Sequence, residues 1–130
     1  MPTPTRSFEV IQLLFRHDVE FIVVGMTAGV LQGAPAVTFD LDLLYDRTEA
    51  NIARLLQALD ALDAVFRGDS RRLRPSVSHL RSAGHKLLMT RLGVVDLLGS
   101  LDERPYADIL AKTVVLDVDG MRIRSSISKS

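Results

Sequence analysis

Residues 23–46, VVGMTAGVLQGAPAVTFDLDLLYD, constrain the fold most, because two alternating aspartates stand inside a mostly apolar stretch. Apolar residues alternate with Asp40 and Asp42, which predicts a strand over residues 36–46. Residues two apart on a strand point to the same face, so these carboxylates project together, with Cα atoms about 6.5–7 Å apart. Carboxylates held in this way are costly to desolvate unless water, a cation or hydrogen-bond donors meet them.

The rest of the chain alternates helix-like and strand-like segments, which predicts an α/β (α+β) domain with a mixed sheet flanked by helices. Helical spacing of apolar residues predicts an amphipathic helix over residues 7–18, with Ser7 as its N-cap, and the longest helix over residues 48–64. The other expected elements are strands over residues 20–25, 85–90 and 94–99 and short helices over residues 28–33 and 105–112. Between residues 65 and 81 apolar residues are few, so we expect a loop with one short strand.

The dipeptide Asp119-Gly120 gives the strongest hairpin signal in the chain. It separates two strand-like segments, residues 113–118 and 121–126, and Asp-Gly favours the tight turn that joins antiparallel strands. Turn chemistry also explains the second Asp-x-Asp triplet, Asp117 and Asp119, to which we assign no site.

Composition places the chain among single-domain proteins. Its 130 residues, 47% hydrophobic, suffice for a core, and we expect one domain over residues 1–130 with residues 1–6 flexible. Sixteen Lys and Arg balance sixteen Asp and Glu, so net charge offers no case for non-specific binding to nucleic acid. The sequence has no cysteine, no signal-like start and no apolar run near the roughly 18 residues of a membrane span. We expect a cytoplasmic protein without membrane contact, and we make no prediction of its oligomeric state.

A divalent cation is the natural partner of Asp40 and Asp42, since Mg²⁺ prefers hard oxygen ligands and two ions can share an Asp-x-Asp pair. Asp96, in the apolar segment GVVDLLG, is the candidate third ligand. An isolated Asp-x-Asp more often marks a solvated strand face, so the upstream Gly25 decides the interpretation. A strand that ends at Gly25 and opens a helix at Met26 or Thr27 leaves backbone N–H groups free to hold a phosphate.

These features together resemble the nucleotidyltransferase superfamily of the DNA polymerase beta type. Its signature is a strand, a glycine turn, a short helix, a strand with Asp-x-Asp, and a later strand with a third acid. Gly25, Asp40 with Asp42, and Asp96 stand in that order here. Gly33 and Thr38 match the spacing of the minimal, abortive-infection-like subgroup, and the likeness extends over roughly residues 21–125.

The resemblance implies a Mg²⁺-dependent enzyme that moves a nucleoside monophosphate from an NTP, such as ATP, to a hydroxyl of RNA, a protein or a small molecule. Asp40 and Asp42 would bind both ions, Asp96 would bind the ion that activates the nucleophile, and Gly25, Met26 and Thr27 would hold the triphosphate. Met26 departs from the Gly or Ser usual at its position, Ala36 from an arginine, and relatives often continue beyond SISKS. These departures motivate an alternative, a catalytically weak binding module such as a toxin–antitoxin component.

Basic residues receive smaller interpretations. Lys86 and Arg91 flank the strand beside Asp96, but lone cations at strand ends are usually solvated, and we favour that role. A basic loop could meet RNA or an acidic partner, although a solvated mobile loop is the commoner outcome; it contains Arg71, Arg72, Arg74 and Arg81. The three histidines, His17, His79 and His85, show no metal-ligand spacing.

Overall fold

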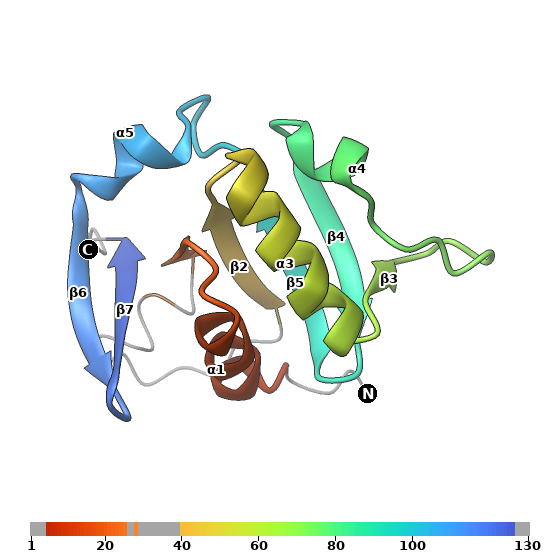
Figure 1. Cartoon of the computed structure of the whole chain (residues 1–130), viewed down its shortest axis with the longest axis horizontal. Coiled ribbons are helices and arrows are strands. Elements are labelled where there is room, and N and C mark those ends of the chain that lie inside the picture. The colour runs from red at the N-terminus through yellow and green to blue at the C-terminus, as the bar shows by residue number, and fades with distance from the viewer. Residues whose placement is uncertain (1–4, 26–27, 29–39, 127–130) are drawn as a thin grey trace.

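Seven strands form one mixed sheet in the computed structural model, which describes residues 5–25, 28 and 40–126 (Figure 1). The strand order is β3-β4-β5-β2-β1-β7-β6. The strands are β1 (Phe21–Val24), β2 (Asp40–Tyr45), β3 (Val65–Phe66), β4 (His85–Thr90), β5 (Gly93–Leu98), β6 (Thr113–Val118) and β7 (Met121–Ser126). Strand β2 pairs in parallel with β5, β1 pairs in parallel with β7, and the other neighbours are antiparallel. The predicted mixed sheet is confirmed.

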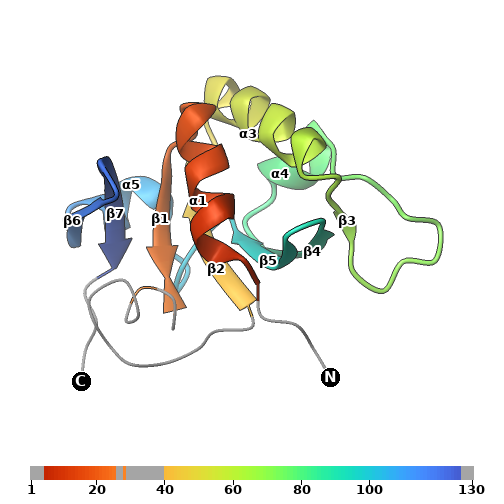
Figure 2. The same ribbon diagram turned by 90° about the horizontal axis from the view of Figure 1, so that it is seen from below.

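Helices divide the two faces of the sheet unequally. The described part of the chain holds α1 (Ser7–Arg16), α3 (Glu49–Ala61), α4 (Val77–Arg81) and α5 (Tyr106–Leu110). Figure 2 shows α1 and α3 on one side of the sheet, where their apolar residues join the larger core. Helix α5 packs Tyr106 and Ile109 on the other side, against Ile22, Leu44 and Leu98. Among the described residues, fewer helices therefore cover that side of the sheet. None of the described helices is long and apolar enough to cross a membrane.

The amphipathic helices confirm the predictions from residue spacing. Helix α1 buries Val10, Ile11 and Leu14, and α3 is the longest described helix. The predicted N-cap of α1 is wrong, because Ser7 is the first helical residue and Arg6 stands at the cap without a side-chain capping bond. The backbone N–H of Arg6 instead donates to the carbonyl of Leu92.

The expectation of a loop over residues 65–81 is only partly correct. It contains the short strand β3, as predicted, but it also contains helix α4, which the sequence pattern missed. Ser76 starts α4 by accepting from the N–H of His79, while its own N–H donates to Nδ1 of His79 at 3.0 Å. A histidine thus takes the place of the Glu or Gln that normally marks such a helix start.

Two hairpins join strands that the sequence predicts in the second half of the chain, and the one at Asp119-Gly120 is itself confirmed. Strands β4 and β5 pair in antiparallel fashion around residues 91–92, and β6 and β7 pair around Asp119-Gly120. Asp119 and Gly120 both have positive φ, 54° and 82°, as a tight hairpin turn requires. Near the first hairpin, Oγ1 of Thr5 donates to the carbonyl of Val94, so residues 5 and 6 belong to the folded part, and residues 1–4 lie outside the described residues.

Candidate functional site

The three predicted carboxylates lie on one face of the sheet, at neighbouring positions of β2 and β5. Asp42 is the register partner of Asp96, and Asp40 pairs with Val94. Partners on parallel strands point to the same side, and Asp40 lies two residues from Asp42. The shared face is the one opposite α1 and α3, because Leu41, Leu43 and Val95, which alternate with the acids, join the core under those helices.

Asp42 is the most perturbed of these acids. Its burial, and next the negative charges of Asp96 and Asp40, raise the pKa of the Asp42 carboxyl above its ordinary value, and only His85 opposes them. Like charges at this spacing disfavour joint ionisation. The three acids therefore share one electrostatic environment, whose charge a cation would relieve.

Asp96 offers one bonded and one unbonded oxygen. Its Oδ2 lies 2.8 Å from Nδ1 of His85, and since an ionised carboxylate only accepts, this nitrogen donates. Its Oδ1 is buried and has no hydrogen-bond partner among the described residues. Buried carboxylate oxygens are normally satisfied, so Oδ1 is the oxygen of Asp96 that could accept an added cation.

Gly25 approaches Asp42 from the end of β1. It has φ +70°, and a Cβ placed on it would lie 2.5 Å from Oδ2 of Asp42. No side chain fits there without moving the carboxylate. The glycine that the sequence predicts as a phosphate turn therefore also leaves space for the central acid.

The residues present suit a hard divalent cation in their chemistry but do not converge on one point. All three acids supply oxygen donors, as Mg²⁺ prefers. Within residues 5–25, 28 and 40–126, no three His, Asp or Glu side chains are placed closely enough to hold a metal ion. The register of β2 and β5 nevertheless brings the three acids to one face of the sheet.

The phosphate-binding part of the predicted site lies mostly outside the described residues. Gly25 is described, whereas Met26 and Thr27 are not, nor are Gly33, Ala36 and Thr38. The predicted helix over residues 28–33 lies in the same undescribed segment apart from Ala28, which is buried.

Lys86 corrects the expectation of a solvated cation. It is 4% exposed, and its ammonium donates to the carbonyls of Ser82 and Gly84 and lies 5.2 Å from the ring centre of Tyr45. Burial, with the nearby charge of Arg47, lowers the pKa of Lys86 to about 8. Because it alternates with His85 and Leu87, it faces away from the acids and holds the α4–β4 connection.

His85 is the residue that motif spacing missed. The signal for it lies in the hairpin: counting back from the turn pairs Thr90 with Gly93, Leu87 with Asp96 and His85 with Leu98. The histidine is thus the diagonal neighbour of Asp96 on the same face, within reach of its carboxylate.

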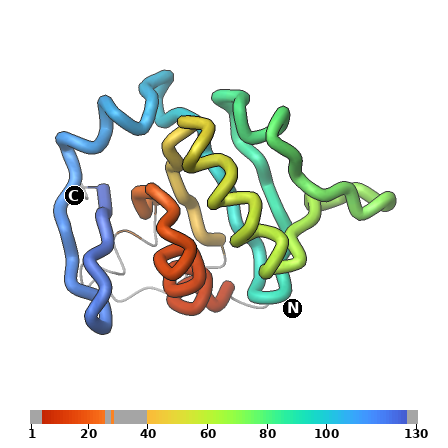
Figure 3. The backbone as a smooth tube through the Cα atoms, in the orientation of Figure 1, coloured from red at the N-terminus to blue at the C-terminus, as the bar shows by residue number. Residues whose placement is uncertain are grey.

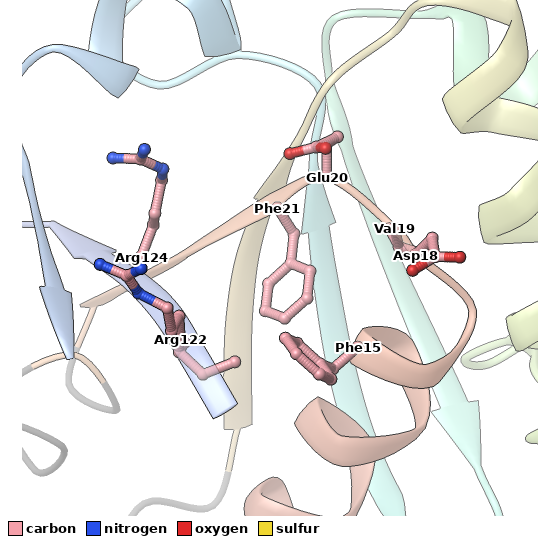
Figure 4. Close-up of a pocket in the computed structure, with 8 residues that line it drawn as sticks. Phe15, Asp18, Val19, Glu20, Phe21, Arg122 and Arg124 are labelled. Carbon is pink, nitrogen blue, oxygen red and sulfur yellow. The ribbon is translucent and has the colours of Figure 1, made fainter. Parts of the chain in front are cut away.

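A separate hollow of about 230 Å³ lies between α1, the start of β1 and β7 (Figure 4). Its ionic residues are Asp18, Glu20, Arg122 and Arg124, so its charges balance. Phe15 and Phe21 lie close together in its wall, and Oε2 of Glu20 accepts from the hydroxyl of Tyr106. None of the three predicted acids lines it.

Comparison with known proteins gives a match at the level of structure. No family model and no curated protein matches the sequence. The structure is similar to the crystal structure of a Thermotoga maritima protein described as a "putative nucleotidyltransferase", with a TM-score of 0.58 and 16% sequence identity. The similarity covers 92% of this chain and 76% of the other. This chain has a nucleotidyltransferase-like fold.

The nucleotidyltransferase-like fold agrees with the fold that the sequence resemblance implied. The match spans nearly the whole chain, so it includes both halves of the sheet and not the Asp-x-Asp segment alone. At this identity the similarity establishes the architecture. The roles of Asp40, Asp42 and Asp96 remain predictions, and so does the abortive-infection-like subgroup.

Proposed function

We propose that this chain is a Mg²⁺-dependent nucleotidyltransferase that moves a nucleoside monophosphate from an NTP to a hydroxyl. The observation that carries the proposal is the register of β2 and β5, which brings Asp42 beside Asp96 and leaves Asp40 on the same face. This occurs within a nucleotidyltransferase-like fold, and next to a glycine that leaves space for Asp42.

Asp40, Asp42 and Asp96 would hold the metal, with Oδ1 of Asp96 as the oxygen that lacks another partner. When bound, Mg²⁺ supplies neutralisation of phosphate charge and a lowered pKa for the attacking hydroxyl. Asp96 is suited to take the proton of that hydroxyl, while His85 fixes its other oxygen. Gly25 would let the triphosphate approach the backbone closely.

The second candidate is a nucleotide-binding module with weak or no catalysis, such as one half of a toxin–antitoxin pair. One observation favours it: among the described residues the acids do not converge closely enough to hold an ion. Met26, bulky at a position where a small residue is usual in the resembling family, supports the same alternative.

Melting curves with Mg²⁺ and each NTP test both candidates. A ligand that binds only the folded state raises stability by RT ln(1 + [L]/Kd), about 2.7 kcal/mol at a hundredfold excess over Kd. We expect stabilisation by Mg²⁺ with at least one NTP, and release of pyrophosphate when an acceptor is present. Stabilisation without pyrophosphate, over a panel of RNA, protein and small hydroxyl acceptors, would support the binding module. A chain unmoved by Mg²⁺ and every NTP at millimolar concentration would refute both.

We further expect His85 to act as a positioning residue for Asp96. Partners that orient metal ligands typically contribute tenfold to a hundredfold in metal affinity. His85→Ala should weaken Mg²⁺ binding by about that factor, and His85→Asn should restore much of it, because its amide nitrogen can take the place of Nδ1. Calorimetric titration with Mg²⁺ and an NTP measures both. Equal affinity for wild type and His85→Ala would show that the bond to Asp96 has no part in the site.

A further inference from the structure

Beyond the acids, at β4, none of the helices that the structure describes covers this face of the sheet. One row of register partners crosses the sheet from Asp40 through Val94 and Met89 to Val65, and the next row runs from Asp42 through Asp96 to Leu87. Leu87 and Met89 are 38% and 39% exposed, although both are large and apolar. They form an apolar platform directly beside Asp96, which we call the β4 platform.

A cationic hollow of about 390 Å³ borders the β4 platform. It is lined by Asp63, Val65, Arg72, Arg74, Met89, Thr90 and Arg91. Arg74 pairs with Asp63 at 3.5 Å and with Asp60 at 3.3 Å, whereas Arg72 and Arg91 form no ion pair within the described residues. The hollow therefore keeps a net positive charge at the far end of the row that begins at Asp40.

The loop that carries Arg72 is tied to the sheet. Figure 1 shows it projecting beyond the edge strand β3. The N–H of Phe66 donates to the carbonyl of Leu73 at 2.8 Å, and the N–H of Arg67 donates to that of Leu87 at 3.0 Å. Arg71 is held inside the loop by Asp69. These bonds close the loop at its base, and residues 71–74 within it are exposed, as expected of a solvated loop.

Spacing and charge favour a polyanion as the occupant. Neighbouring strands lie about 4.8 Å apart, so Met89 is about 10 Å from Asp40 and Val65 about 14 Å, measured across the sheet. An anion in the hollow is thus well separated from a triphosphate at the acids, and one small anion cannot reach both. A single-stranded nucleic acid fits the whole surface. The flat faces of its bases can lie on Leu87 and Met89, while arginines bind its phosphates.

We propose that the β4 platform and the hollow beside it bind the end of a single-stranded nucleic acid, the acceptor whose hydroxyl reaches the acids. The inference rests on the proposed function for the role of acceptor, but not for the binding itself. Of the possible acceptors with a hydroxyl, the proposal names nucleic acid. The zero net charge of the chain is no obstacle, because the cations gather locally.

Fluorescence anisotropy with a labelled 12-nucleotide single-stranded RNA, in EDTA and without NTP, tests the surface apart from the chemistry. For single strands each phosphate contact contributes about 0.7 to the slope of log affinity against log salt. Arg72→Gln with Arg91→Gln should weaken binding at least tenfold and reduce the slope by about 1.4. Leu87→Ser with Met89→Ser should weaken binding severalfold and leave the slope unchanged, because it removes base contacts only. Arg16→Gln, an exposed arginine on the opposite side of the sheet, is the matched control and should change neither.

Three outcomes would overturn the proposal: no binding of RNA by the wild-type chain at 50 mM salt, equal binding by the double arginine variant, or equally tight binding of polyglutamate, which would indicate an acidic protein partner. Titration of the wild-type chain with Mg²⁺ and NTP separates the two proposals. Nucleotide binding without RNA binding removes only this acceptor, and RNA binding without nucleotide binding removes only the enzymatic function.

Discussion

Asp42→Asn raises the melting temperature of the ion-free protein and abolishes its response to Mg²⁺ with NTP, if the carboxylates form a metal site. The raised pKa of Asp42 means that ionising it costs the folded state free energy, chiefly through burial and through Asp96 and Asp40. Asparagine keeps the shape and removes one of the crowded charges. At pH 7 we therefore expect the melting temperature of Asp42→Asn to exceed that of the wild type by a few degrees.

The gain from Asp42→Asn depends on pH with a definite sign. A carboxyl whose pKa is raised on folding keeps its proton longer in the folded state, so wild-type stability falls as pH rises from the ordinary value of 3.8 through the raised pKa. The variant lacks this loss. The difference between variant and wild type should therefore vanish near pH 3 and reach its full size at neutral pH.

Asp119→Asn is the matched control for Asp42→Asn. Asp119 is exposed in the β6–β7 turn, where φ is +54°, a conformation that asparagine also tolerates. We expect an unchanged melting temperature and an unchanged response to Mg²⁺. A lower melting temperature for Asp42→Asn would instead mean that Asp42 is a structural acceptor, since an amide cannot replace both carboxylate oxygens.

Gly25→Ala should lower stability and weaken Mg²⁺ and NTP binding together. Two costs combine: the left-handed backbone, roughly 1–2 kcal/mol for a residue with a Cβ, and the contact between that Cβ and Oδ2 of Asp42. The second cost displaces the central acid. Denaturant unfolding and Mg²⁺ titration measure the two effects separately.

Gly68→Ala isolates the backbone cost of Gly25→Ala. Gly68 has φ +80° and nothing within 4 Å of the position of a Cβ. The Gly68→Ala variant should therefore lose stability through backbone strain alone and bind Mg²⁺ and NTP as the wild type does. In an Asp42→Ala background the extra cost of Gly25→Ala should disappear, as a double-mutant cycle would measure. If Gly25→Ala still costs more stability than Gly68→Ala in the Asp42→Ala background, the new Cβ contacts a group other than Asp42.

Most of the fold could be predicted because the spacing of apolar residues differs clearly between the helical and the strand segments. The apolar spacing of α1 and α3 and the Asp-Gly turn of β6–β7 are local signals, and they were sufficient. Helix α4 was missed because it is short and its capping partner is His79, which carries no standard signature. Ser7 was misplaced as a cap because Arg6 takes its backbone partner from distant Leu92, a tertiary contact.

For the candidate site too, local sequence predicts some features, whereas long-range pairing decides others. Asp40 and Asp42 share a face by strand alternation alone, which any sequence reveals. The closeness of Asp96 depends on the parallel pairing of β2 with β5, a long-range choice that the resemblance suggested and the residues could not. The buried position of Lys86 and the bond of His85 follow from register and from the α4 connection, which no local pattern encodes.

The parallel pairing of β2 and β5 has a kinetic meaning as well. Asp42 and Asp96 are 54 residues apart in the chain, whereas the β4–β5 hairpin closes over a two-residue turn. Local hairpins form early, and pairings that close long loops form late. We therefore expect the two acids to meet only after the local hairpins have formed, against their mutual repulsion, and a folding intermediate without the β2–β5 pairing would lack the candidate site.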